Sequence, residues 1–244
     1  MAKDKTTEVA TTIKGVSDSM PDWLTKGNAG SEDVSAADMI LPRVDVLQAL
    51  SPQLKKNDGA FIPGAEQGQI FNTVTGQIYG SSVSFVPVLF RKEWTVWKKR
   101  NAGGGFCGAH PTELQGNEAV AAMENPNDYE CVETHQHFAM VLADTGVQEA
   151  VFSMTKSKIK VSRALNTLVQ LAGVDRFAKA YRLDAIEVNG DKGDFWSFKA
   201  HPVGFVDKEL YERGQNLLEM IRLGQADVDR ADTDTDRVAP SAEL

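Results

Sequence analysis

Two hairpin signals constrain the fold more than any other feature of this sequence. Apolar residues at 137–142 and 147–152 flank the turn sequence Ala-Asp-Thr-Gly at 143–146. A second pair, residues 181–188 and 195–199, is joined by Asn-Gly-Asp-Lys-Gly. Hairpin strands are antiparallel, and these strands are not each followed by a helix, as parallel strands would be. The sequence predicts an α+β protein with an antiparallel sheet or a small OB-like barrel, packed with helices.

Further elements follow from composition and apolar spacing. Residues 83–89 and 93–97 are rich in Val, Phe and Trp and are expected as strands, with Pro87 indicating an edge position or a bulge. Helical spacing predicts three helices, from residue 35 toward residue 50, from Ser153 or Thr155 to Leu171, and from about Asp207 to Leu223.

The chain divides by composition into three parts. Residues 1–37 are rich in small polar residues and are expected to be a flexible arm with one apolar cluster around Trp23. Residues 38–223 form the expected single α+β domain. Residues 224–244 hold six acids, two arginines and few large apolar side chains, so a disordered acidic tail is expected. That tail either contacts the body or a partner, or serves only solubility.

Location is predicted from what the sequence lacks. No apolar run approaches the roughly 20 residues that cross a bilayer, and the first residues have no signal-peptide pattern. We therefore expect a cytoplasmic protein without membrane contact. Its two cysteines give no disulfide framework.

Charge is sorted into blocks. The chain carries a net charge of −8, yet residues 88–108 hold five basic residues against one acid, and residues 151–182 hold seven against one. Residues 109–150 hold eight acids and no Lys or Arg. Positive charge concentrated in this way indicates a site for a polyanion. The sequence does not show whether the two basic blocks meet.

The first basic block is interleaved with aromatic rings. Its candidate nucleic-acid-binding residues are Arg91, Lys92, Trp94, Trp97, Lys98, Lys99, Arg100 and Phe106. Cations for phosphates and flat rings for bases are what single-stranded nucleic acid requires. On a strand, Trp94 and Trp97 face opposite sides, so we expect Trp97 to be the exposed ring. The alternative is a core strand that ends in a solvated basic turn.

The second block lies where a helix is expected. Its candidate binding residues are Lys156, Lys158, Lys160 and Arg163. On a helix, Lys156, Lys160 and Arg163 would line one face, beside a helix N-terminus that favours anions. The alternative is a solvated helix face.

A competing hypothesis is a zinc site. Cys107, His110, Cys131 and His135 fall within 29 residues of one another, and their spacing could hold a tetrahedral ion. No phosphate-binding, metalloprotease or serine-hydrolase motif occurs, so we expect no enzyme and no cofactor.

Several short motifs recur across residues 38–222. They are Leu-Pro-Arg-Val at 41–44, Leu-Gln-Ala-Leu-Ser-Pro at 47–52, Ile-Pro-Gly-Ala at 62–65, Gly68, Phe71, Asn72, Pro87, Val88, Arg91, Lys92, Trp94, Trp97, Gly105, Phe106, Gly108, Phe-Ser-Met-Thr at 152–155, Lys160, Ser162, Arg163, Asn166 and Tyr-Arg-Leu at 181–183. Together they resemble motifs of phage single-stranded DNA-binding proteins, including the Drc type, which couples DNA binding to transcription by a phage RNA polymerase. The resemblance implies support of phage replication or transcription in the host cytoplasm. The chain ends in Ala-Glu-Leu, without the aromatic tip of bacterial single-stranded DNA-binding proteins, which puts their mode of tail docking in doubt.

The leading hypothesis is a binder of single-stranded DNA with little sequence preference. Its expected partners are single-stranded DNA, further copies of itself, and a phage RNA or DNA polymerase contacted through the acidic tail. The first alternative is an adaptor that docks on a phage polymerase or virion component. The second is a zinc-dependent nucleic-acid enzyme.

Overall fold

The computed structural model describes residues 29–30, 40–190, 193–224 and 227–228. The chain divides into two units, Met1–Val34 and Ser35–Leu244. In the first unit, Ala29 and Gly30 form a turn. The expectations about Trp23 and about most of the two tails fall outside the described residues.

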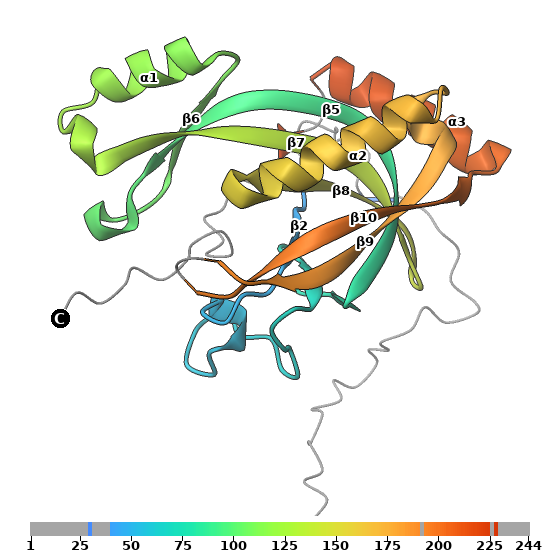
Figure 1. Cartoon of the computed structure of the whole chain (residues 1–244), viewed down its shortest axis with the longest axis horizontal. Helices are drawn as coiled ribbons and strands as arrows, with labels where there is room; N and C mark the ends of the chain where they lie inside the picture. Colours follow the sequence, from blue (N-terminus) through green and yellow to red (C-terminus); the bar gives the residue numbers. More distant parts are fainter. Residues whose placement is uncertain (1–28, 31–39, 191–192, 225–226, 229–244) are drawn as a thin grey trace, which may run out of the picture. The chain divides into compact units, whose positions relative to one another are not determined.

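A six-stranded antiparallel sheet forms the centre of this unit (Figure 1). Its strands run in the order β10-β9-β5-β7-β8, and β6 also pairs with β5. The strands are β5 (Ser82–Lys98), β6 (Phe106–His110), β7 (Tyr129–Ala143), β8 (Gly146–Thr155), β9 (Lys179–Val188) and β10 (Phe195–Phe205). Among the described residues β10 and β8 do not pair, so the sheet is open. The α+β prediction is confirmed, as an antiparallel sheet and not a barrel.

Both predicted hairpins are present. The β7–β8 pair runs from Ala143↔Gly146 to Thr134↔Thr155, and the β9–β10 pair runs from Val188↔Phe195 to Lys179↔Phe205. The two strands expected at 83–89 and 93–97 are one 17-residue strand, β5. Its register against β7 shifts between Pro87 and Leu89, which is the bulge that Pro87 predicted. The pairing of β5 with β9 ends at Phe85, so Pro87 is paired with β7 alone, which also agrees with the edge alternative.

Each face of the sheet has its own core. Alternating side chains of β5 point to opposite faces, so Phe85 joins one cluster and Val86 the other. The first cluster includes Leu165 and Val169 of α2 (Ile159–Leu171). The second includes Leu217 and Ile221 of α3 (Lys208–Arg222). The two helices therefore cover opposite faces of the sheet.

The helix expected from residue 35 toward residue 50 is wrong from residue 40 onward. Ile40–Leu41 is strand β1, paired in parallel with β11 (Asp227–Val228). Val44–Val46 is strand β2, and all three of its residues are buried. It belongs to a second sheet, β2-β3-β4, with β3 (Ile70–Asn72) and β4 (Ile78–Gly80). Pro42 lacks an N–H to continue a helix, and burial on both sides of β2 imitates helical spacing over so short a stretch.

Gln48 joins this small sheet to the β9–β10 hairpin. Its side-chain amide donates to the Trp196 carbonyl and accepts from the Trp196 N–H, both at 2.8 Å. Gly68 lies against the Trp196 ring, where a Cβ would come within 2.8 Å of the ring carbons. Residues outside the main sheet therefore fix the start of β10 through hydrogen bonds and packing at Trp196.

The helices depart from expectation in two places. α2 begins at Ile159, later than expected, because residues 153–155 continue β8 and η5 (Lys156–Lys158) follows as a 3-10 turn. α1 (Glu113–Ala121), capped by Thr112, was not expected. The helix from Asp207 is confirmed as α3, and the Asp207 side chain accepts from the Leu210 N–H. Short 3-10 turns complete the unit: η2 (Pro52–Leu54), η3 (Arg100–Ala102), η4 (Pro126–Asp128) and η6 (Arg176–Ala178). In the part of the chain that is described, no helix is long and apolar enough to span a membrane.

The contact between α3 and the sheet gives a first test. A Cβ at buried Gly214 would lie 2.7 Å from the Phe177 Cβ and 3.3 Å from the Met140 Cε. Gly214→Ala should therefore lower the free energy of unfolding by about 1–3 kcal/mol through overpacking. Denaturant unfolding measures this, with Gly59→Ala as control, since nothing lies within 4 Å of a Cβ there. Equal stability of the two variants would contradict this close packing.

Candidate functional site

A pocket of about 1350 Å³ opens beside α2 on one face of the sheet. Its lining comes from the start of β7, η5, the outer side of α2, and the β9–β10 hairpin. We call it the α2 groove. The apolar part of its lining comprises Val132, Ile159, Val161, Ala164, Leu168, Ile186, Val188, Phe195, Phe198 and Ala200. The volume exceeds the roughly 300–1,000 Å³ of typical small-molecule sites.

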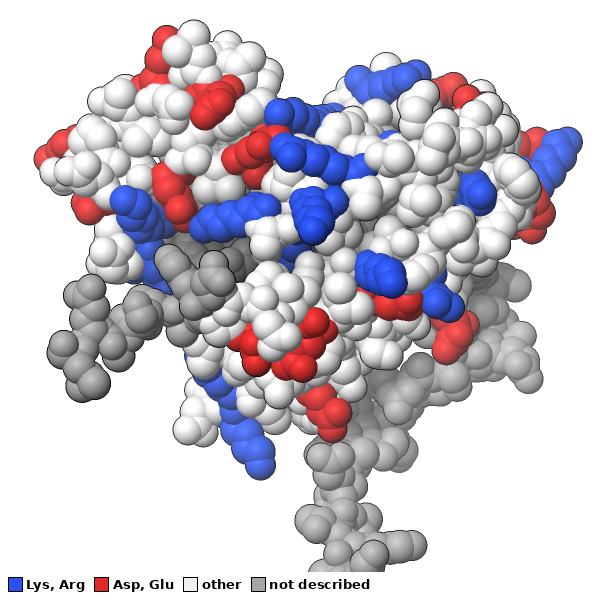
Figure 2. Space-filling model, viewed as in Figure 1, with Lys and Arg blue, Asp and Glu red and all other residues white. Residues whose placement is uncertain are grey.

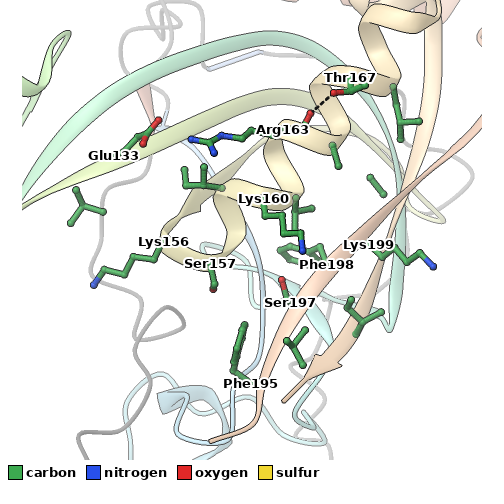
Figure 3. A pocket seen from close by; sticks show the side chains of 18 of the residues that line it. Glu133, Lys156, Ser157, Lys160, Arg163, Thr167, Phe195, Ser197, Phe198 and Lys199 are labelled. Atoms are coloured by element: carbon green, nitrogen blue, oxygen red, sulfur yellow. Dashed lines mark hydrogen bonds between the residues drawn. The ribbon is translucent and has the colours of Figure 1, made fainter. Parts of the chain in front are cut away.

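Four cations line the α2 groove: Lys156, Lys160, Arg163 and Lys199. In Figure 3, Lys160 extends toward Phe198, Arg163 points toward Glu133, and Lys199 points away from α2. Within the described part of the chain, Lys160, Arg163 and Lys199 have no carboxylate partner within 4 Å, whereas Lys156 lies 3.5 Å from Glu130. All three predicted residues line the groove, but Lys156 lies in η5 before the α-helix, and Lys160 and Arg163 point in different directions, so the three do not form one row on a helix face.

The backbone at Lys156 is unusual. Its φ of +45° is the only positive value outside glycine in the described residues. Such a conformation costs a non-glycine residue about 1–2 kcal/mol. It lies where the chain turns from β8 into η5, and it leaves the Lys156 side chain on the lining of the groove.

Lys158 does not belong to the binding surface. Only 2% of the residue is exposed, and its Nζ lies 2.7 Å from the Asp45 Oδ1 of β2. Because a buried ion pair cannot reach a ligand in solvent, Lys158 is corrected to a structural residue that ties η5 to the small sheet.

The first basic block is split by the pleat of β5. Lys92 lies opposite His135 of β7, on the α2 side, and Arg91 lies opposite Gln136, on the other. Lys92 bonds Glu133 at 2.8 Å and lies 4.4 Å from the centre of the Trp94 ring. The two blocks thus approach one another through Lys92, Arg163 and Lys156.

The end of β5 carries the other candidates of this block. The Lys98 Nζ lies 5.9 Å from the Tyr129 ring, the Lys99 Nζ donates to the Asn127 carbonyl at 2.7 Å, and Arg100 is exposed. Trp97, expected as the exposed ring, is half-buried. Its indole N–H donates to the Thr95 hydroxyl, and its ring meets Phe106 edge-on at 5.3 Å. Trp94 and Trp97 lie on opposite faces, as the alternation predicted.

Acids from residues 109–150 reach the groove. Glu130 and Glu133 of β7 line it and pair with Lys156 and Lys92. Figure 2 shows Lys and Arg gathered across the middle of the visible face, with several Asp and Glu beside them and over the α1 region. Glu130 and Glu133 therefore neutralise part of the positive charge at the groove.

A buried chain of hydrogen bonds lies below this rim. The Ser162 hydroxyl of α2 contacts the His135 Nδ1 at 2.6 Å and the His137 Nε2 at 2.7 Å. The His135 Nε2 lies 3.0 Å from Glu133, and Arg176 lies 2.9 Å from the His137 Nδ1. Ser162, His135 and His137 are all at most 4% exposed. The hydrogen-bond network runs from Lys92, the partner of the groove residue Glu133, to Arg176, which also bonds Asn166 of α2.

Only one proton arrangement satisfies this chain when both histidines are neutral. Arg176 can only donate, so the His137 Nδ1 accepts and its Nε2–H donates to Ser162. The Ser162 hydroxyl then donates to the His135 Nδ1, and the His135 Nε2–H donates to Glu133. Burial and the neighbouring Arg176 hold the pKa of His137 well below its usual range. Burial also lowers the pKa of His135, against the opposing effect of Glu133.

The pKa values of two further groups in this hydrogen-bond network are also lowered. Burial lowers the pKa of Arg176 to about 10, so it remains a cation at neutral pH. The hydrogen bond from Lys92 lowers the pKa of Glu133. The order Ser162–His135–Glu133 has the residue types of a nucleophile, base and orienting acid. Ser162 has no exposed surface, however, so a substrate carbonyl has no path to its oxygen.

The zinc candidates are not gathered. Among the described residues, no three His, Cys, Asp or Glu side chains form a metal-binding group. Cys107 is exposed on β6, and the Cys131 Sγ packs against Gly116 of α1. Both ring nitrogens of His135 are engaged by Ser162 and Glu133.

Some lining residues were missed from the sequence. Phe195 and Lys199 of β10, with Ile186 and Val188 of β9, line the groove but belong to neither basic block. The hairpin signal located these strands, but nothing local indicates that they pass beside α2. None of the eight candidates of the first basic block lines the groove; these are Arg91, Lys92, Trp94, Trp97, Lys98, Lys99, Arg100 and Phe106.

One comparison with known proteins identifies a relation. A family model described as Pam3 phage gp34-like protein matches residues 10–227. No curated protein and no solved structure matches the chain.

The buried histidines predict a pH-dependent stability. Their folded pKa values lie below 6.5, so in the unfolded chain they take up protons first as pH falls. Stability is therefore full above about pH 6.5 and is lost as pH falls toward the folded pKa values, by at most about 1.4 kcal/mol per pH unit per histidine. Urea unfolding between pH 7.5 and 5.5 measures this. His137→Asn should be less stable at pH 7.5 and show a shallower dependence; an unchanged slope would contradict the assignment.

Proposed function

The chain belongs to the family of Pam3 phage gp34-like proteins, and from this premise we propose that it is a non-enzymatic single-stranded DNA-binding protein. It would act in the host cytoplasm with little sequence preference, in support of phage replication or transcription. The resemblance to Drc-type proteins agrees with this role, and the geometry of the α2 groove is its main support.

The observation that supports the proposal is that one groove is lined by both apolar residues and cations. Lys156 of η5 and Lys160 and Arg163 of α2 line it together with the apolar residues. Phosphates would lie on the cations, and bases would contact the floor, where Phe195 offers a ring face. A duplex keeps its bases stacked inside, so it could use the cations but not the floor.

The charge balance of the groove favours moderate affinity. Four cations and two acids line it. Each phosphate neutralised on a single strand contributes about −0.7 to the slope of log affinity against log salt. The residues of this groove would therefore contribute a slope of no more than about −3.

The first test removes cations from the groove. K156A/K160A/R163A should weaken binding to a labelled single-stranded oligonucleotide and reduce the salt slope by about 2, because three phosphate contacts are lost. Fluorescence anisotropy across a salt series measures both quantities. The matched control is K208A/R213A/R222A on α3, which removes three exposed cations from the opposite face.

Three outcomes are distinct. An equal loss of oligonucleotide affinity in the two triple variants would show that binding depends on the net charge of the protein and not on the groove. Effective competition by duplex DNA would contradict single-strand selectivity. An absence of binding by the unaltered protein at the lowest salt would overturn the proposal and favour the adaptor hypothesis, in which the cations meet an acidic protein surface.

The second test addresses stacking. Phe195→Leu keeps an apolar side chain in the groove but removes the ring, so binding should weaken by about 1–3 kcal/mol if one base stacks there. The control is Phe205→Leu at the other end of β10, where the ring is 72% exposed and outside the groove. Melting temperatures of both variants separate a binding effect from a folding effect. Unchanged affinity of Phe195→Leu would remove this ring from the site.

A further inference from the structure

Donor groups from three elements converge on one carboxylate at the edge of the α2 groove. The Glu133 Oε1 of β7 accepts from the Lys92 Nζ of β5 at 2.8 Å and from the His135 Nε2–H at 3.0 Å. In Figure 3 the Arg163 guanidinium of α2 and the Glu133 carboxylate point toward one another, without the contact of an ion pair. One negative charge is therefore surrounded by two cations and an imidazole N–H.

These surroundings favour an anion, and solvent reaches them. The hydrogen bond from Lys92 is the largest cause that lowers the pKa of Glu133, and the hydrogen bond from His135 adds to it. The side chains of Lys92 and Glu133 are 43% and 30% exposed. An ion pair this exposed adds little stability, so an anion from solution can compete with the Glu133 carboxylate.

His135 restricts which anion can replace Glu133. The His135 Nδ1 is engaged by Ser162 and only 4% of the residue is exposed, so its Nε2–H needs an acceptor where the carboxylate now lies. A phosphodiester group supplies one, because it carries a single negative charge and non-bridging oxygens that accept hydrogen bonds. One oxygen would accept from Lys92 and His135. A phosphate is larger than a carboxylate, so another oxygen would extend toward Arg163.

We propose that Lys92, His135 and Arg163 form a phosphate subsite, which the Glu133 carboxylate occupies until a ligand phosphate displaces it. The subsite extends the binding surface from the groove lining to the first basic block, where the Lys92 Nζ lies 4.4 Å from the centre of the Trp94 ring. Glu133 then lowers the affinity of the groove for anions without blocking it. That the phosphate belongs to single-stranded DNA rests on the proposed function, but the subsite itself does not.

Inorganic phosphate tests the subsite without nucleic acid. Glu133→Gln keeps an oxygen for Lys92 and His135 but removes the negative charge that a phosphate must displace. Replacing chloride with phosphate at equal ionic strength should therefore raise the melting temperature of E133Q more than that of the unaltered protein. K92M/E133Q should lose this additional rise. Equal rises in E133Q and the unaltered protein would overturn the subsite.

The matched control is Glu149→Gln. Glu149 of β8 lies 3.6 Å from Arg213 of α3, and its side chain is 28% exposed. The control therefore makes the same change in net charge at a similarly exposed ion pair, and Glu149 is not part of the groove lining. Its melting temperature should respond to phosphate as that of the unaltered protein does.

Oligonucleotide binding tests the displacement of Glu133. E133Q should bind a labelled single-stranded oligonucleotide about twofold to fivefold more tightly at low salt, because one weak ion pair no longer opposes the ligand. E149Q should leave the affinity nearly unchanged. An equal gain in both variants, or no gain in E133Q, would overturn the displacement while the unaltered protein still binds DNA. A phosphate response specific to E133Q, in a protein that binds no oligonucleotide, would keep the subsite and refute the DNA-binding function.

Discussion

The α2 groove depends on how α2 is fixed to β7, and Ser162 makes the buried polar contacts of that attachment. The Ser162 hydroxyl sits between two histidine rings of β7, so the helix cannot rotate or slide without breaking two buried hydrogen bonds. Leaving such groups unsatisfied costs about 1–3 kcal/mol each, more than the net value of a made bond. The cations of α2 lie on the same helix, so their spacing from the sheet is set by this contact.

The attachment has a second anchor, and the two anchors act at different points. Lys158 pairs with Asp45 and fixes η5 to the small sheet, just before α2 begins. A buried ion pair adds little net stability, but it restrains the positions of its two partners. Moving one partner away would leave an unpaired charge inside the protein, which is costly. With Ser162 holding one turn further on, the chain from Lys156 to Arg163 is fixed at both ends. The groove rim is therefore preorganised, apart from the long side chains themselves.

Local sequence signals predicted the main hairpins and α3, but they did not predict which distant residues pack together. The Ala-Asp-Thr-Gly turn and the Asp207 cap are decided within a few residues, so both hairpins and α3 could be predicted. The β2 segment could not, because Ile40, Val44 and Leu47 follow helical spacing although Val44–Val46 is a short, fully buried strand. Lys158 resembled its neighbours in sequence, and only the distant Asp45 makes it structural. Phe195 enters the groove through tertiary packing that no local pattern records.

The acids of β7 reduce the positive charge that the two basic blocks can offer a ligand. Read along the sequence, residues 109–150 and the two basic blocks are separate regions of opposite charge. In the fold, β7 runs between β5 and β8, and this brings Glu130 and Glu133 to the groove beside Lys156 and Lys92. Within the described residues, the groove cations without a carboxylate partner are then Lys160, Arg163 and Lys199, which lie beside apolar lining residues. Such a site gains less from long-range attraction and more from contact, which suits a ligand that is both anionic and flat-faced.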